Sequence, residues 1–170
     1  MNQNLILYRR KNIKINFKHL RTINYIEQIR NIRKKILYTH LPTNLCFYKE
    51  DFSIATYHFG IFIDNELVSV LTLIKNFYIY NTKLSSYQLR GMATKTEFQR
   101  RYIGKSLLQK SLQYINLRTN TSLVWCNARK NVFNFYSKNK FKQQGSLFYI
   151  KNIGLHYTMY FDCRLLKKQS

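Results

Sequence analysis

The sequence predicts a mixed α/β fold, with helices packed against a central mixed sheet. Runs of β-branched and aromatic residues, typical of strands, are interspersed with segments whose apolar residues recur at helical spacing. Helices that cross between neighbouring strands indicate a layered sheet. The chain has only 1 Pro and 5 Gly among 170 residues, so no flexible linker divides it. We therefore expect residues 1–170 to form a single domain.

The first predicted elements are a strand and a helix. A strand is expected from Ile13 to Phe17, because apolar and polar residues alternate there. A helix is expected over Thr22–Leu37, followed by a polar loop that extends to about Ser53. The apolar face of this helix consists of Tyr25, Ile29, Ile32 and Ile36. The basic residues that we expect to face solvent here are Arg21, Arg30, Arg33 and Lys34.

Three extended segments follow. Ala55–Ile63 and Leu67–Lys75 are rich in strand-forming residues, and the short polar segment Asp64–Glu66 separates them. So short a connection predicts an antiparallel hairpin. A third strand is expected over Tyr87–Thr94, after a polar and aromatic connection through Asn81.

The second half of the chain is predicted to alternate helices and strands. The elements expected are a helix from Gly104 to about Leu117, a buried strand over Ser122–Asn127, a short helix over Asn131–Lys138, and two aromatic-rich strands over Gly145–Ile150 and Leu155–Arg164. The residues that share the apolar face of the first helix are Ile103, Leu107, Leu108, Ser111 and Ile115.

The chain is strongly basic. It has 29 Lys and Arg against 7 Asp and Glu, a net charge of +22. Such a charge attracts polyanions, among them nucleic acid, an anionic membrane surface and a phosphate-rich cofactor. The basic residues are nevertheless spread along the whole chain, and its richness in Asn, Lys, Ile, Tyr and Phe is typical of an AT-rich genome. We therefore favour compositional bias as the cause and keep nucleic acid as a secondary candidate partner.

Cysteine and histidine residues give no indication of a metal site. Cys46, Cys126 and Cys163 lie far apart, and none has metal-ligand spacing to a histidine. The N-terminal sequence lacks the apolar core of a signal peptide, and no apolar stretch approaches the roughly 20 residues that cross a bilayer. We expect a soluble cytoplasmic protein that binds neither metal nor membrane.

Leu89–Leu108 is the segment with the clearest chemical signal. A strand leads into a polar loop, and Gly104 then opens an amphipathic helix. The first turn of a helix has unpaired N–H groups and the positive end of the helix dipole, which together suit a phosphate. The residues that would add cations and a hydroxyl are Arg100, Arg101, Lys105 and Ser106. These features predict a diphosphate site, with an ordinary helix start and a solvated basic turn as the alternative.

This segment resembles the acetyl-CoA signature of the Gcn5-related N-acetyltransferase (GNAT) family. The pattern Gln/Arg-x-x-Gly-x-Gly/Ala falls on Gln99, Tyr102 and Gly104. Downstream, LVWCNAR and FYSKNKF are similar to a strand and helix that end in FYxxxGF in many bacterial members. The segments TYHFGIF around His58 and NIGLHYTMY around His156 resemble small bacterial acetyltransferases. The resemblance covers most of the chain after about residue 28, and it implies a twisted mixed sheet flanked by helices.

The resemblance implies that acetyl-CoA is the cosubstrate. Backbone N–H groups of Gln99–Gly104 would hold the pyrophosphate, and Met92–Thr94 would pair with the pantetheine arm. The amide at Met92 would polarise the acetyl carbonyl. The cofactor would fill a gap where the strands Tyr87–Thr94 and Ser122–Asn127 splay apart. The implied cofactor-binding residues are Met92, Ala93, Thr94, Gln99, Arg100, Arg101, Tyr102, Ile103, Gly104, Lys105, Ser106, Asn127 and Tyr136.

Proton transfer is the second role that the resemblance implies. Tyr136 stands where many members have a tyrosine that protonates the departing thiolate, and a phenol suits this because its pKa of about 10 exceeds that of a thiol. The general base stays open among His58, Glu97, His156 and water, since a strand histidine is more often a satisfied core residue. No nucleophile–base pair is evident, so direct attack of an amine on the thioester is expected.

The chain departs from the family pattern at two positions. Tyr102 replaces the first glycine of the loop; with a negative φ its amide could still donate, whereas a positive φ would weaken CoA binding. Lys140 replaces the glycine of FYxxxGF, and we expect the neighbouring Asn139 to adopt the left-handed conformation instead.

The function expected is therefore N-acetyl transfer to a primary amine of a small molecule or peptide. So basic a chain does not favour a polycationic acceptor, which points to a small or acidic amine or a peptide N-terminus. The alternative is a non-catalytic nucleic-acid or ribosome-associated protein on a degenerate acetyltransferase fold. The aromatic final strands also make a homodimer a candidate assembly.

Overall fold

The computed structural model describes residues 13–20, 22–40, 42 and 46–167. Two compact units make up the chain: Met1–Leu73 with Gly91–Ser111, and Ile74–Arg90 with Leu112–Ser170. In the described part of the chain, no helix is long and apolar enough to cross a membrane. Among the same residues, no three His, Cys, Asp or Glu side chains gather as metal ligands would. The prediction for Arg21 lies outside the described residues.

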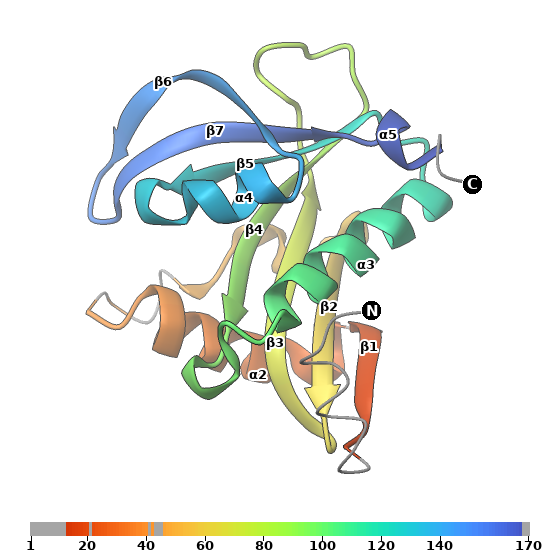
Figure 1. Cartoon of the computed structure of the whole chain (residues 1–170), viewed down its shortest axis with the longest axis vertical. Coiled ribbons are helices and arrows are strands. Elements are labelled where there is room, and N and C mark those ends of the chain that lie inside the picture. The colour runs from red at the N-terminus through yellow and green to blue at the C-terminus, as the bar shows by residue number, and fades with distance from the viewer. Residues whose placement is uncertain (1–12, 21, 41, 43–45, 168–170) are drawn as a thin grey trace. The chain divides into compact units, whose positions relative to one another are not determined.

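Seven strands form one mixed sheet, in the order β1-β2-β3-β4-β5-β7-β6 (Figure 1). The strands are β1 (Ile15–Leu20), β2 (Thr56–Ile63), β3 (Glu66–Lys75), β4 (Ser86–Thr94), β5 (Leu123–Arg129), β6 (Lys142–Ile150) and β7 (Gly154–Asp162). The helices are α2 (Thr22–Leu37), α3 (Ile103–Arg118), α4 (Phe133–Lys138) and α5 (Arg164–Lys167), with 3-10 turns η2 (Lys49–Phe52), η3 (Thr96–Phe98) and η4 (Lys130–Val132). β4 and β5 are parallel, whereas β1–β2, β5–β7 and β6–β7 are antiparallel. The predicted fold class and the order of its main elements are confirmed.

The first unit has an apolar core between α2 and the strands. The buried members of this core are Leu20, Ile29, Ile32, Phe62, Leu67, Val70 and Ala93. The middle of α3 lies on the opposite face, since the Lys110 ammonium stands 5.8 Å from the ring of Phe17, three residues from Leu20 on β1. All five residues predicted for the apolar face of α3 are buried. Burial of these two helical faces contributes hydrophobic stabilisation.

A two-residue turn joins β2 to β3. Asp64 and Asn65 have φ values of 46° and 71°, as a type I′ hairpin turn requires. Asp and Asn tolerate this left-handed region because their short polar side chains hydrogen-bond locally. The Oδ1 of Asp64 accepts a bond from the N–H of Lys14 at 3.0 Å. The predicted antiparallel hairpin is thus formed with a shorter turn than the sequence indicated.

Arg33 contradicts the prediction that it faces solvent. Its side chain is completely buried and forms an ion pair of 2.8 Å with Asp51, which is also completely buried. Arg33 follows Ile32 and lies one turn after Ile29 on the buried side of α2, so its guanidinium enters the protein. Asp51 belongs to η2, a turn inside the segment predicted as a polar loop.

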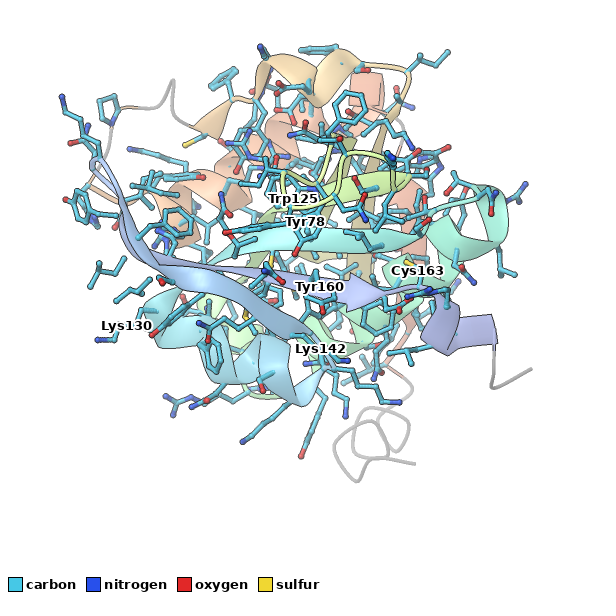
Figure 2. The ribbon with its side chains drawn as sticks, turned by 90° about the horizontal axis from the view of Figure 1, so that it is seen from above. Tyr78, Trp125, Lys130, Lys142, Tyr160 and Cys163 are labelled. Carbon is cyan, nitrogen blue, oxygen red and sulfur yellow. The ribbon has the colours of Figure 1, made fainter. Side chains whose placement is uncertain are left out.

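The second unit contains the remaining strands and an aromatic cluster. Tyr78, Trp125 and Tyr160 gather there, with the Tyr78 ring centroid 6.1 Å from Trp125 and 5.8 Å from Tyr160 (Figure 2). Trp125 and Tyr160 are direct partners in the β5–β7 register. β7 and β6 form a long antiparallel hairpin, and β6 is the last strand of the sheet (Figure 1).

The start of β6 and the end of β7 are among the boundaries in this unit that differ from the prediction. β6 begins at Lys142, because Gly145 with φ +74° lies at a register shift within the strand and does not start it. The last strand ends at Asp162, because Arg164 opens α5, where its side chain bonds back to the Asp162 carboxylate.

The prediction that Asn139 is left-handed at the end of α4 is wrong. Lys140 itself is left-handed with φ +67°, whereas Asn139 has φ −98°. The N–H of Lys140 bonds to the Ser137 carbonyl and that of Phe141 to the Tyr136 carbonyl, which is the Schellman arrangement. The Phe141 ring packs on Tyr136 at 5.2 Å, so hydrophobic contact fixes the turn at Lys140 despite its Cβ.

Candidate functional site

The site predicted in the first unit begins at the end of β4. Gly91 has φ +57°, a left-handed residue inside a strand, and the regular alternation of buried and exposed residues stops there. Met92 and Thr94 are half-buried, whereas Ala93 is part of the core. β4 therefore enters the loop with its last residues fixed by the core and partly accessible.

The loop before α3 has an unusual backbone. Arg100 and Tyr102 are both left-handed, with φ values of 57° and 62°. Alternation of backbone hand points successive N–H groups toward one side and creates a concave anion-binding surface. The N–H of Ser106 bonds to the Tyr102 carbonyl at 2.9 Å, which makes Tyr102 the cap residue of α3. By helix geometry, the amides of residues 103–105 then have no acceptor within the helix.

Close packing brings the two predicted cofactor segments together. A Cβ built on Gly104 would lie 3.3 Å from the Thr94 hydroxyl and 3.4 Å from the Met92 methyl carbon. A side chain at position 104 would therefore crowd the side chains of Thr94 and Met92. The glycine at this position is explained by close approach, since its φ is not positive.

Side-chain hydrogen bonds also link the loop to β4. The Nε2 of Gln99 donates to the Thr94 carbonyl at 2.9 Å. Ser69 of β3, completely buried, donates its hydroxyl to the Ala93 carbonyl at 3.2 Å and lies 2.7 Å from the Thr94 hydroxyl. Met92–Thr94 and the loop are thus held by bonds from both sides.

The loop carries an excess of positive charge. Arg100 and Arg101 are exposed, and Lys105 is half-buried in the first turn of α3. Glu97, in η3, is exposed. Cations and amides beside a helix N-terminus favour a phosphate group over a neutral ligand.

Tyr102 adopts the conformation that the family glycine would adopt without cost. A left-handed backbone costs a bulky L-residue roughly 1–2 kcal/mol. The Tyr102 side chain is 44% exposed, so no burial of its ring compensates fully for this strain. Of the two alternatives drawn from the sequence, the structure has the positive φ. The backbone thus has the hand of an anion-binding loop, and the weaker CoA binding expected from the bulky Tyr102 side chain stays a prediction.

The second unit contains the other two predicted site residues. The β4–β5 register runs from Ser86 opposite Leu123 to Gln88 opposite Trp125, and both strands continue beyond these pairs. Asn127 follows on β5, half-buried, and its Oδ1 accepts a bond of 3.3 Å from the Thr158 hydroxyl. That contact holds the amide of Asn127 in place.

Tyr136 lies in α4 and is buried. Its ring packs edge-on against Phe135 and Phe141, each at 5.2 Å between centroids. These contacts explain the ring position by packing. Its role as an acid stays a prediction.

His58 was one of the candidate bases, and its surroundings argue against that role. Its side chain lies in β2 and is 1% exposed. The Nε2 stands 2.9 Å from the Asp51 carbonyl and the Nδ1 2.8 Å from the Thr72 hydroxyl. Burial lowers the pKa of His58, so the neutral ring donates from Nε2 and accepts at Nδ1. With both nitrogens engaged, His58 is a satisfied core residue.

His156 has a different environment. Its Nδ1 lies 2.8 Å from the Gly154 carbonyl, and burial lowers the pKa of the ring. This histidine belongs to β7 and pairs with Arg129 of β5. A neutral imidazole is the form that accepts a proton, so His156 stays a candidate base together with Glu97 and water.

Sequence reasoning missed two supporting residues, Ser69 and Arg33. Ser69 gave no signal beyond a small polar residue at an otherwise apolar position of a strand. The burial of Arg33 could have been inferred, because Arg33 extends the apolar face of α2. A chain with only 7 Asp and Glu also offers few candidate partners for it.

Comparison with known proteins identifies close resemblances. A family model described as an acetyltransferase (GNAT) domain matches residues 43–161. An uncharacterised N-acetyltransferase of Bacillus subtilis, YitI, is 35% identical over 135 residues, covering 79% of this chain and 90% of the relative.

Solved structures show the same fold at low sequence identity. FeeM, an N-acyl amino acid synthase from uncultured soil microbes, has a TM-score of 0.76 at 14% identity and covers 93% of this chain and 96% of its own. An aminoglycoside 6′-N-acetyltransferase complexed with coenzyme A has a TM-score of 0.70 at 11% identity, with coverages of 87% and 97%. The comparisons give no support to the nucleic-acid alternative.

Proposed function

The chain belongs to the GNAT family of acetyltransferases, and on that premise we propose that it transfers the acetyl group of acetyl-CoA to a primary amine by direct attack in a ternary complex. The observation that carries the proposal is the loop that opens α3. Two left-handed residues, Arg100 and Tyr102, precede a helix start whose amides lack helical acceptors. This geometry suits the diphosphate of CoA.

The residues of the loop fit such a group chemically. The amides of residues 102–105 donate hydrogen bonds, and Arg100, Arg101 and Lys105 supply positive charge. Met92–Thr94, which Gly104 and Gln99 join to the loop, would hold the pantetheine arm through their backbone. The Met92 amide would donate to the acetyl oxygen, where negative charge develops during transfer.

The proposed reaction balances with one proton donor and one acceptor. The amine nitrogen forms a bond to the acetyl carbon, and the bond from that carbon to sulfur breaks. Tyr136 would donate its phenol proton to the departing thiolate. The amine loses a proton to a base, for which His156, Glu97 and water are the candidates.

For the acceptor we propose a small or acidic primary amine or a peptide N-terminus. A net charge of +22 repels polycations at long range. The fold itself does not select among amines, because the structural neighbours include a spermidine N-acetyltransferase as well as the aminoglycoside enzyme.

The first experiment is a thermal shift with saturating acetyl-CoA. A ligand at 100 times its Kd stabilises a protein by about 2.7 kcal/mol, which gives a clear rise in Tm. The shift should be lost when Gly104 is replaced by Val, whose side chain would separate α3 from Thr94 and Met92. An exposed residue farther along α3, Leu117→Ala, serves as the control and should leave the shift unchanged.

An RNA oligomer at two salt concentrations completes the test. No shift with acetyl-CoA, together with a salt-sensitive shift with RNA, would mean that the fold has lost the family's chemistry. A positive result would be followed by a screen of amines with a thiol-release assay.

A further inference from the structure

We infer that the buried Arg33–Asp51 ion pair is a positioning device for the cofactor strand. It would act by fixing the backbone of β4 at Gly91 and thereby the direction of the amides of Met92–Thr94. This inference rests on the proposed function, because it assigns a role toward the pantetheine arm of CoA. All the groups involved lie in the first unit.

The Arg33 guanidinium is held rigidly. Nη1 lies 2.8 Å and 3.0 Å from the two carboxylate oxygens of Asp51, and Nη2 lies 3.1 Å from Oδ1. Nη2 also donates to the Thr72 hydroxyl at 2.6 Å, and Nη1 donates to the Cys46 carbonyl at 3.2 Å. A planar group with this many fixed partners on separate segments cannot turn without breaking several bonds at once.

The partners of Arg33 are themselves anchored. Asp51 accepts a bond from the Tyr48 N–H at 3.1 Å, and the Tyr48 ring lies 4.2 Å from the guanidinium carbon. The Thr72 hydroxyl accepts a hydrogen bond from Arg33 and donates one to the Nδ1 of His58 at 2.8 Å. The buried network therefore ties α2 and η2 to the inner strands β2 and β3.

Gly91 is the point where this network meets β4. A Cβ built on Gly91 would lie 2.5 Å from the Nε of Arg33 and 3.1 Å from the Tyr48 hydroxyl. The guanidinium thus packs directly against the backbone at the one left-handed residue of β4. Nε is buried and has no hydrogen-bond partner among the described residues, so its contact with this backbone is one of packing.

The position of Gly91 gives the contact its functional meaning. Met92–Thr94 follow immediately, and their far end is fixed by Ser69, which contacts both Ala93 and Thr94. Arg33 and Ser69 thus fix the two ends of the segment whose amides would meet the pantetheine arm. Misplacement of reacting groups by about 1 Å costs up to a hundredfold in rate, so such bracing has a large effect.

The test uses the double variant Arg33→Met with Asp51→Asn in the full chain. Met fills most of the volume of the arginine stem, and removal of both charges avoids a buried unpaired carboxylate. Arg30→Met is the matched control, since Arg30 lies one turn earlier on α2, is also largely buried, and pairs with the exposed Glu27 in place of Asp51. Circular dichroism first establishes that each variant is folded.

Two ligands then distinguish an effect on β4 from an effect on the loop. Acetyl-CoA engages both the loop and β4, whereas ADP presents a diphosphate without a pantetheine arm. In the double variant we expect the Kd for acetyl-CoA to rise about tenfold and the Kd for ADP to stay within about twofold of the wild type. Arg30→Met should change neither value.

Amide hydrogen exchange gives a readout that needs no ligand. Exchange in the segment 91–94 should be faster in the double variant than in Arg30→Met, while exchange in the hairpin β6–β7, which contains no residue of the network, is unchanged. Equal exchange in the two variants, or an equal loss of acetyl-CoA and ADP affinity, would overturn the inference. Failure of the wild type to bind acetyl-CoA would instead count against the proposed function. The exchange result would still decide whether the Arg33–Asp51 pair fixes the backbone of β4.

Discussion

Tyr102 illustrates, at the scale of a residue, how this chain departs from its family. It holds φ at +62°, a conformation that glycine adopts freely. We predict that Tyr102→Gly raises the free energy of unfolding by about 1 kcal/mol, because relief of left-handed strain exceeds the added entropy of the unfolded chain. Urea denaturation measures this gain.

The same substitution tests the expectation for the cofactor. Removal of the ring should tighten acetyl-CoA binding several-fold, which calorimetry would detect. The control for the stability measurement is Arg101→Gly, where φ is not positive and no strain is relieved. A Tyr102→Gly variant no more stable than the Arg101→Gly variant would refute the strain argument.

The burial of His58 should make the stability of the protein depend on pH. Burial holds its pKa below the ordinary value of 6.5, so the folded protein binds fewer protons than the unfolded chain when the pH falls below 6.5. The free energy of unfolding should therefore fall as the pH is lowered from 7 toward 5, by up to about 1.4 kcal/mol per pH unit for this group.

Urea denaturation at several pH values checks this dependence. His58→Gln, which does not titrate, should show a shallower slope than the wild type even if it is less stable at pH 7. Because burial also lowers the pKa of His156, His156→Gln is tested alone and in combination, and the double variant should have the smallest slope. An unchanged slope in His58→Gln would contradict the assignment of His58 as a buried neutral group.

At the scale of an element, the end of α4 combines a favourable motif with an unfavourable residue. The two Schellman bonds and the Phe141–Tyr136 contact hold Lys140 left-handed. Lys140→Gly should raise the free energy of unfolding by about 1 kcal/mol. Lys138→Gly, inside the last turn of the same helix, should lower it by about the same amount. Thermal or urea denaturation of the pair measures both; a loss of stability in each would show that the motif is not formed.

At the scale of the whole molecule, the charge of +22 acts on any anionic ligand. We predict that the Kd for acetyl-CoA rises several-fold between about 50 and 500 mM salt, because the Debye length falls from roughly 14 Å to 4 Å. S-acetylpantetheine, which lacks the phosphates, is the matched ligand and should show little salt dependence. Isothermal titration measures both; equal salt dependence for the two ligands would contradict a role for the basic loop in holding phosphate.

The amino-acid pattern alone specified most of the architecture. Helical spacing predicted α2 over Thr22–Leu37, the bounds that the structure has, since one continuous apolar stripe is a local property. The signature around Gln99–Ser106 identified the loop, the helix that follows it and the family. These features depend on residues close in sequence, which is why they can be read without a structure.

Tertiary structure decided the features that depend on distant residues or on backbone hand. Local patterns do not identify Asp51 as the partner of Arg33, because the two residues lie on different elements. The sequence favoured Asn139 over Lys140 as the left-handed residue, because intrinsic propensity favours Asn, whereas the Phe141–Tyr136 contact selects the position. The sequence therefore determined which elements form and which chemistry they resemble, and long-range packing determined which polar groups are buried and where the backbone turns left-handed, because packing energy outweighs local propensity.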